Sequence, residues 1–282
     1  VDDTALDLQA LTITGDLVAT GAGLTDSGSL VIAGTTTLAA DGQDILFNNS
    51  NDFGTVIVSS GNNVTLVDAD DIDLGASSVG GALSVTTTSG AITDSGAVSV
   101  VGNVTLDDQG QAGIALDLLQ ADANVILTSA GNTDITNDTA LNLEGTVTGT
   151  LEADATAGGI TDSAELNVGG VATFMSATGT NVILDTAANT FGSTVSFVAS
   201  AGTLADVTIV DDTALDLQAL TITGDLVAMG AGLVQSGALS VGGTSTLTST
   251  GSGNDILLAG ANDFGTSLLI TTDATTGSDA TL

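Results

Sequence analysis

The feature that most constrains the fold of this chain is a tandem repeat. Residues 1–20 read VDDTALDLQALTITGDLVAT, and residues 210–229 repeat these letters with one change at the last position. Weaker copies of the opening begin at Val67, as VDADDIDL, and at Thr136, as TNDTALNL. A period of tens of residues is typical of solenoids and related arrays, in which each unit packs on its neighbours. The four starts divide the 282 residues into repeat units 1–66, 67–135, 136–209 and 210–282.

Two further markers keep the phase of this repeat. The first is a TDS-like segment 23 to 25 residues after each unit start, and it contains Asp26, Asp94, Asp162 and, in the fourth unit, Gln235. The second is N-x-F-G, made of Asn51, Phe53 and Gly54, of Asn189, Phe191 and Gly192, and of Asn262, Phe264 and Gly265. The second unit has residues 120–123, QADA, instead of this marker. We expect Asp122 to occupy the phenylalanine position there.

Within each unit, apolar and polar residues alternate with a period of two. Examples are TVIV at residues 55–58, NVTL at 103–106 and STVSFV at 193–198, and Gly, Asn, Asp or Ser turns separate such segments. This alternation predicts short β-strands, and no helical periodicity accompanies it. The chain also has no proline, so nothing prevents its strands from donating N–H groups to their neighbours.

We therefore predict an all-β fold, a parallel β-helix or β-solenoid that runs as one continuous domain through residues 1–282. The marker spacing predicts three turns of about 23 residues per unit, or about 12 turns in all. In the first unit these turns would begin at Val1, Leu24 and Leu46. The alternative is a string of β-sandwich modules. It is less favoured because such a module usually needs an aromatic core residue, and the second unit has none.

The last residues lead back into the first ones. DATL at residues 279–282 matches the segments NVTL, NTDI and DVTI, which precede the other three unit starts. We expect either that the sequence is part of a longer array or that copies stack end to end through open strand edges. Any targeting segment would then lie outside it.

Charge and composition exclude several functions. The chain has 34 acidic residues and no Lys, Arg or His, which gives a net charge of −34. Such a polyanion repels phosphates and anionic lipids, and no apolar run is long enough to span a bilayer, so we expect neither nucleic acid binding nor membrane insertion. The hydrophobic fraction of 43% is too high for a disordered acidic tail. Because the chain lacks basic side chains and has no Trp or Tyr to stack a sugar, we predict that it is not an enzyme.

The order of the segments resembles a known family. GAITDSGAVSVVGNVTL at residues 90–106, DILL at 255–258 and ANDFGT at 261–266 resemble the β-strand repeats of giant bacterial surface proteins related to filamentous haemagglutinin. The resemblance covers all four units. It implies a secreted, right-handed parallel β-helix that serves as a stalk, adhesin or surface fibre, without catalytic or cofactor-binding residues.

On these grounds we expect a structural segment of an extracellular or cell-surface filament or adhesin stalk. Its expected partners are further copies of itself, divalent cations, and cell-surface or matrix polymers. The alternative is a calcium-dependent adhesive module that binds glycans or ice.

Recurring acidic residues are the candidate calcium ligands. They are Asp3, Asp26, Asp68, Asp94, Asp138, Asp162 and Asp212. Carboxylate and amide oxygens suit Ca²⁺, but Asp and Asn also serve as turn residues that accept local N–H groups. If the turns begin as expected, Asp3, Asp26 and Asn48 stack at about 5 Å, close enough to raise one another's pKa or to bind a cation. The sequence leaves both interpretations open.

The phenylalanine of the N-x-F-G marker also has two interpretations. Phe53, Phe191 and Phe264 can be exposed anchors for a partner or fillers of the interior. We favour the interior, because a single ring beside a glycine turn is usually packed inside.

Overall fold

The computed structural model describes residues 4–110, 112–272 and 277–282. Asp3 therefore lies outside the described residues. The chain divides into two compact units, Val1–Thr139 and Ala140–Leu282, and each is considered by itself. All regular structure in the described residues is β-strand, and no helix there is long and apolar enough to cross a membrane.

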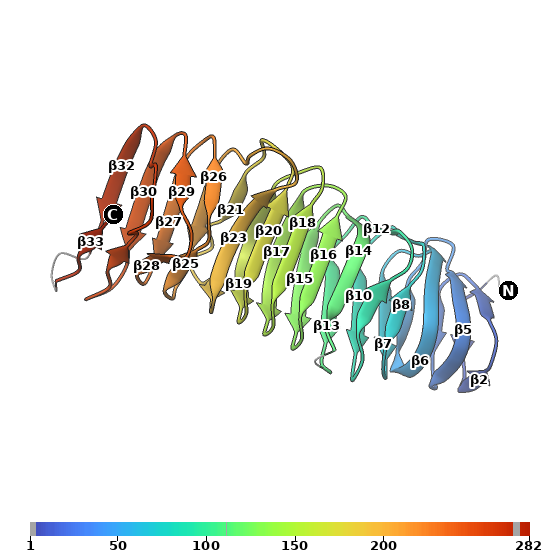
Figure 1. Ribbon diagram of the computed structural model, residues 1–282. Coiled ribbons are helices and arrows are strands. Elements are labelled where there is room, and N and C mark those ends of the chain that lie inside the picture. The colour runs from blue at the N-terminus through green and yellow to red at the C-terminus, as the bar shows by residue number, and fades with distance from the viewer. Residues whose placement is uncertain (1–3, 111, 273–276) are drawn as a thin grey trace. The chain divides into compact units, whose positions relative to one another are not determined.

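In the first unit, short strands stack side by side in parallel (Figure 1). One ladder runs through β1, β4, β6, β7, β10, β13 and β15, and it places Leu6, Leu24, Ile45, Val64, Leu83, Val104 and Val125 in register. The strands of this unit are β1 (Leu6–Leu8), β2 (Leu11–Ile13), β3 (Leu17–Thr20), β4 (Leu24–Asp26), β5 (Leu30–Ala39), β6 (Ile45–Ser60), β7 (Val64–Asp68), β8 (Ile72–Leu74), β9 (Ser77–Val79), β10 (Leu83–Thr87), β11 (Ile92–Asp94), β12 (Val98–Val100), β13 (Val104–Asp108), β14 (Ile114–Ala121), β15 (Asn124–Ser129) and β16 (Thr133–Asn137).

The second unit is built in the same way. One ladder runs through β17, β19, β21, β24, β27, β30 and β32, and it places Leu141, Ile160, Val182, Val207, Leu226, Ser245 and Leu268 in register. The strands of this unit are β17 (Leu141–Val147), β18 (Leu151–Ala155), β19 (Ile160–Val168), β20 (Ala172–Ser176), β21 (Val182–Leu184), β22 (Thr190–Phe191), β23 (Thr194–Ala199), β24 (Val207–Val210), β25 (Leu215–Leu217), β26 (Leu220–Ile222), β27 (Leu226–Gly230), β28 (Leu233–Gln235), β29 (Leu239–Val241), β30 (Thr244–Ser249), β31 (Ile256–Leu257), β32 (Ser267–Thr271) and β33 (Ala280–Thr281).

These ladders confirm the predicted parallel β-solenoid and correct the number of turns. The described residues of each unit form seven turns, which gives about 14 turns instead of 12. The six steps from Leu6 to Val125 cover 119 residues, or about 20 per turn instead of 23. A repeat of 66 to 74 residues therefore exceeds three turns. The predicted turn start at Leu46 is also wrong by one position, because Ile45 points inward and Leu46 is exposed.

The interior is a narrow stack of small aliphatic side chains. In β7, β10 and β13, buried residues alternate with partly exposed ones, as a period of two requires. Phe47 and Phe53 are fully buried and stack with ring centroids 6.1 Å apart. Gly54 follows Phe53 because a Cβ there would lie 2.9 Å from the Ala33 carbonyl oxygen of the preceding turn. Close contact between turns therefore explains the glycine of the marker.

Candidate functional site

The two sequence markers of the first repeat meet in one hydrogen-bond network. Asp26 ends β4 and is only 8% exposed. Its carboxylate accepts the backbone N–H groups of Asn48 and Asn49 in the next turn, at 3.1 and 3.2 Å. It also accepts the side-chain Nδ2 of Asn51, at 2.9 Å. Three donors of the following turn therefore hold this carboxylate.

The side chain of Asn51 connects its own turn to the turn before it. Its buried side chain donates to Asp26 in the turn before, and its Oδ1 accepts the backbone N–H of Leu30 at 2.8 Å. In the turn after, Asp68 lies beside Asn51 in the ladder. The Asp68 Oδ2 accepts the N–H of Phe53 at 2.9 Å, and its Oδ1 accepts the N–H of Asp70 at 3.0 Å. We call Asp26, Asn51 and Asp68 the first polar triad.

Burial dominates the electrostatics of Asp68. Its side chain is fully buried, and this desolvation raises its pKa to about 7 despite the two N–H groups, which favour the charged form. The carboxyl therefore gains or loses its proton near neutral pH.

The same network recurs in the second unit. Asn189 donates its Nδ2 to Asp162 at 2.5 Å, and its Oδ1 accepts the N–H of Leu166 at 2.8 Å. Asp211 accepts the N–H of Phe191 at 3.3 Å. Burial raises the pKa of Asp211, and its Oδ2 has no partner among the described residues. We call Asp162, Asn189 and Asp211 the second polar triad.

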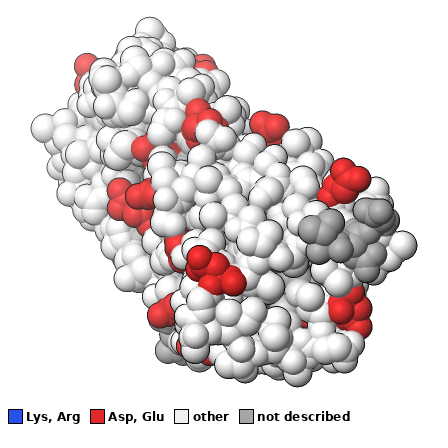
Figure 2. Space-filling view, turned by 90° about the vertical axis from the view of Figure 1, so that its right-hand side faces the viewer, with Lys and Arg blue, Asp and Glu red and all other residues white. Residues whose placement is uncertain are grey.

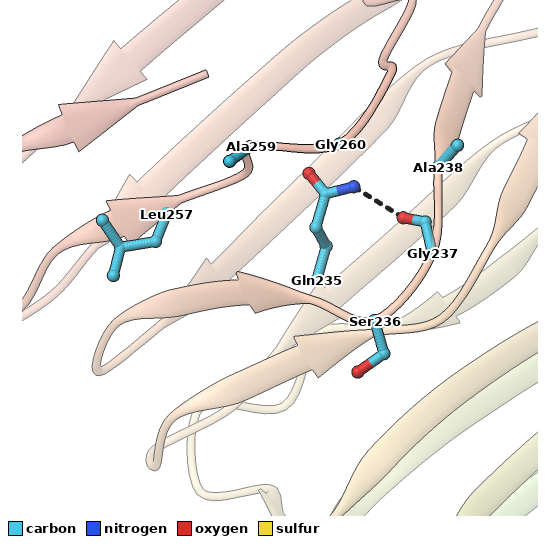
Figure 3. Close-up of a pocket in the computed structure, with 7 residues that line it drawn as sticks. All are labelled: Gln235, Ser236, Gly237, Ala238, Leu257, Ala259 and Gly260. Atoms are coloured by element: carbon cyan, nitrogen blue, oxygen red, sulfur yellow. Dashed lines mark hydrogen bonds between the residues drawn. The ribbon is translucent and has the colours of Figure 1, made fainter.

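In the fourth repeat a glutamine stands in place of the aspartate of the TDS marker, and it still accepts a hydrogen bond from the asparagine of the N-x-F-G marker. Gln235 accepts the Nδ2 of Asn262 at 2.7 Å, and Asn262 accepts the N–H of Leu239 at 3.0 Å. Figure 3 shows the Gln235 amide nitrogen directed at the Gly237 carbonyl, at 2.6 Å. An open pocket of about 290 Å³ lies here, lined in part by Leu257 and Gly260. Its polar groups are largely satisfied by the protein itself.

The second repeat departs from this pattern, and the structure corrects its alignment. Ala121, not Asp122, occupies the phenylalanine position, because it lies beside Val100 as Phe53 lies beside Ile32. Leu119 then stands where the other repeats have the asparagine. The expectation for Asp122 was wrong because residue identity alone aligns the repeats there, whereas the register between strands decides which residue occupies the phenylalanine position. Ala121 still donates its N–H to the next repeat, to the Oδ1 of Asn137 at 2.7 Å.

In the described part of the second repeat no asparagine donates to Asp94, and two backbone N–H groups of the following turn bind its carboxylate. It accepts the N–H groups of Asp117 and Leu118 at 3.1 and 3.0 Å. Burial raises its pKa to about 6, and the neighbouring Asp117 carboxylate contributes in the same direction.

The candidate calcium ligands fall into three different positions. Asp26, Asp94 and Asp162 hold the following turn through backbone N–H groups, whereas Asp68 is buried in the first polar triad. Asp138 and Asp212 are exposed, and their backbone N–H groups bond to the preceding turn. Asp3 is outside the described residues. No group of three or more potential metal ligands occurs in the described part of the chain.

The expected stack of Asp3, Asp26 and Asn48 is wrong in its register. Asp26 lies beside Leu8 in the ladder. Asn48 contacts Asp26 through its backbone N–H and not through its side chain, because β6, which contains Asn48, passes over the Asp26 carboxylate. The calcium site stays a prediction, but these oxygens already accept protein donors.

The phenylalanines of the marker differ in burial. Phe53 and Phe191 are fully buried, and Phe191 packs edge-on against Phe174 with centroids 6.0 Å apart. Phe264 is only half-buried. Gly192 and Gly265, like Gly54, approach a carbonyl oxygen of the preceding turn too closely for a side chain.

Sequence reasoning missed the pairing of the two markers and the buried acceptor at the second residue of the second, third and fourth repeats. A signal for the pairing was available. Asp26 and Asp162 belong to repeats that contain the asparagine, and the fourth repeat pairs its asparagine with a glutamine that can also accept a hydrogen bond. The acceptor position holds Asp68, Asn137 and Asp211, all of which have a side-chain oxygen for the same backbone N–H.

Stacked parallel turns joined by a recurring polar network define a β-solenoid repeat protein. The chain belongs to the family described as repeats of unknown function (DUF5649), whose model matches residues 1–60, 61–129, 130–198 and 204–271. Neither a curated protein nor a solved structure matches the chain. The resemblance to filamentous haemagglutinin repeats stays a prediction.

Proposed function

We propose that the chain is a structural segment of an extracellular or cell-surface filament or adhesin stalk. In this role the repeats supply length and stiffness. Recognition of a receptor, glycan or matrix polymer would belong to other parts of the assembly.

The observation that carries the proposal is the use of the recurring polar residues. In both polar triads the asparagine donates to the turn before it, and the turn after it accepts the N–H of the phenylalanine. These side chains therefore join turns within the protein. Residues that recur for catalysis or ligand binding would instead direct their polar atoms outward into a cavity.

The surface supports the same role. Figure 2 shows acidic side chains spread over the visible face, and the sequence has no basic residue to pair with them. Like charges on neighbouring molecules repel at low ionic strength, which keeps them from bundling sideways. Such a surface suits a spacer that must stay separate from its neighbours.

The calcium-dependent module has less support. Asp26 and Asp162 each already accept three protein donors. A cation at either carboxylate would have to compete with these bonds.

Denaturation with and without calcium tests the proposal. A structural role predicts the same urea midpoint with calcium and with a chelator, because the turns are held by protein donors. A calcium-dependent module predicts a large rise with calcium, about 2.7 kcal/mol at a concentration of 100 times Kd. Antibody labelling of intact source cells tests the location, and labelling only after permeabilisation would contradict it.

A further inference from the structure

One loop of the first unit contains the single Asp-Gly sequence of the chain, Asp41–Gly42. The loop connects β5 to β6, and both residues are exposed. The N–H of Gln43 donates to the carbonyl of Ala40 at 2.9 Å, so Asp41 and Gly42 are the central residues of a β-turn. Their φ angles are both positive, 50° and 72°, which is the pattern of a type I′ turn.

The backbone of Asp41 is in an unfavourable conformation. Among the described residues, Asp41 is the one residue other than glycine with a positive φ. A side chain crowds its own backbone in this region, although aspartate tolerates it better than most residues do. The counterpart turn of the third repeat is closed by the same bond, from the N–H of Thr180 to the carbonyl of Ala177, and there only Gly179 has a positive φ. The left-handed Asp41 is therefore not needed to form this turn.

Two groups of this turn can react with each other, and neither is held by another part of the protein. Within the described structure, the Asp41 carboxyl and the N–H of Gly42 have no hydrogen-bond partner. No atom lies within 4 Å of the position that a Cβ on Gly42 would occupy. The carboxyl and the next nitrogen along the chain are therefore free to approach each other.

Asp26 in the TDS marker shows the opposite situation. Its carboxylate accepts three donors of the following turn. The nitrogen that follows it along the chain belongs to Ser27, and its N–H donates to the carbonyl of Leu8 at 2.9 Å. Both groups are held by neighbouring turns, so the fold prevents at Asp26 the approach that it allows at Asp41.

We propose that Asp41 is a site of spontaneous backbone modification, at which aspartate converts to isoaspartate in the folded protein. The nitrogen of Gly42 attacks the carbon of the neutral Asp41 carboxyl group. A C–N bond forms and closes a five-membered succinimide ring, and the carboxyl hydroxyl leaves as water with the proton of the N–H. Glycine favours this step because it has no side chain beside the nitrogen, and both reactants belong to one chain.

Water completes the conversion. It adds to the ring carbonyl that was the main-chain carbonyl of Asp41, and the bond from that carbon to the Gly42 nitrogen breaks as the nitrogen stays bonded to the former side-chain carbon. The chain then continues through the side chain of residue 41, and the former main-chain carbonyl becomes a carboxylate. Nothing is oxidised or reduced, and the net charge is unchanged.

The fold can accommodate the product. Isoaspartate adds one carbon to the main chain of an exposed turn, outside the strands on either side. Ile45, at the start of β6, is buried and pairs with Leu24 and Val64 in the ladder, so the next strand stays anchored. The inference does not depend on the structural role proposed above, but a segment that persists in a filament would accumulate this product with time.

Labelling with heavy-oxygen water tests the proposal. The folded chain is aged in mildly acidic heavy-oxygen water, returned to ordinary water and digested with an endoproteinase that cleaves before aspartate and not before isoaspartate. Conversion leaves residues 26–43 uncleaved before position 41 and adds heavy oxygen to residue 41, which mass spectrometry of the peptides detects. Asp44 in the same loop is the internal control, because the β-branched Ile45 follows it and cleavage before it should persist.

Ser27→Gly separates the effect of the fold from that of the sequence. It gives Asp26 the same small neighbour that Asp41 has, and the three donors to its carboxylate stay in place because they belong to the following turn. In this folded variant we expect conversion at position 41 and none at position 26, whereas both positions should convert alike in urea.

Two variants of the turn complete the comparison. Asp41→Thr introduces the residue that the third repeat has at this position, Thr178, and should lose the conversion. Thr178→Asp gives the exposed turn of the third repeat an aspartate before Gly179 and should add a second site of conversion.

Conversion of Asp41 only after unfolding in urea would overturn the proposal, because the turn would then protect this residue as the neighbouring turns protect Asp26. Equal conversion at positions 26 and 41 in Ser27→Gly, with the urea midpoint of the wild-type chain, would also overturn it, because the fold would then not select the site. Neither result would affect the proposed structural role.

Discussion

Replacing Asn51 with alanine tests the first polar triad. The change removes a side chain that is fully buried and that bonds two turns. It leaves the N–H of Leu30 without its acceptor, and it takes one of three donors from Asp26. The first repeat should therefore lose stability although no part of the backbone is altered.

The magnitude follows from these two bonds. A buried donor left without a partner costs about 1–3 kcal/mol, and a hydrogen bond to a charged group contributes about 1.5–3 kcal/mol. Asp26 keeps its two backbone donors and some contact with water, so the loss of its bond to Asn51 costs less than the loss of all its partners would. We expect a loss of about 3 kcal/mol, which corresponds to roughly a hundredfold in an equilibrium constant.

Hydrogen exchange is the suitable assay, because stacked repeats can unfold in parts. The amide of Leu30 should exchange roughly a hundredfold faster in Asn51→Ala than in the wild-type chain. Asn48→Ala is the matched control, because its side chain is exposed and only its backbone bonds to Asp26. If both variants exchange alike at Leu30, the assignment of Asn51 as a connector between turns is refuted.

Three further predictions concern single residues and the surface. Burial raises the pKa of Asp68 to about 7, above its unfolded value of about 3.9, so this group favours folding most at low pH and loses that contribution as the pH rises through 7. Asp68→Asn introduces the residue that the third repeat has at this position, Asn137, and should reduce the dependence of the urea midpoint on pH between these two pKa values. Asp52→Asn, at an exposed position, should leave that dependence unchanged. Identical curves of midpoint against pH for the two variants would contradict the assignment of this dependence to Asp68. A Cβ on Gly28 would lie 2.5 Å from the backbone nitrogen of Ala10, so Gly28→Ala should cost about 1–3 kcal/mol in urea denaturation, whereas Gly15→Ala, with no atom within 4 Å, should be tolerated. Equal midpoints for the two glycine variants would show that the turns separate easily at this point. Calcium or magnesium should raise light scattering by bringing chains of charge −34 together, and a chelator should reverse it; scattering unaffected by the chelator would exclude this cause.

Most of the fold could be predicted from local pattern. Alternation in segments such as β7 and β10 reflects the two faces of a strand, and the four repeats require each unit to pack on its neighbour. The number of turns could not be predicted, because turn length varies from 18 residues between Leu6 and Leu24 to 25 between Val182 and Val207. Loops of different length account for this variation, and the amino-acid sequence alone does not show which loops are longer.

The residues of the site could be predicted, but their partners could not. The sequence singled out Asp26 and Asn51 separately, since both recur with the period of the repeat. Their contact depends on the register between turns, which places Asp26 beside Leu8 and under the strand that carries Asn51. The burial of Asp68 was missed for the same reason, because an acidic residue near a unit start also fits an exposed turn.

A crystal structure of this chain would test the central claim most directly, through the distance between the Asn51 Nδ2 and the Asp26 carboxylate. We expect about 2.9 Å, with the same bond between Asn189 and Asp162. Separate antiparallel modules, or an Asp26 carboxylate turned away from Asn51 toward a bound cation, would contradict it.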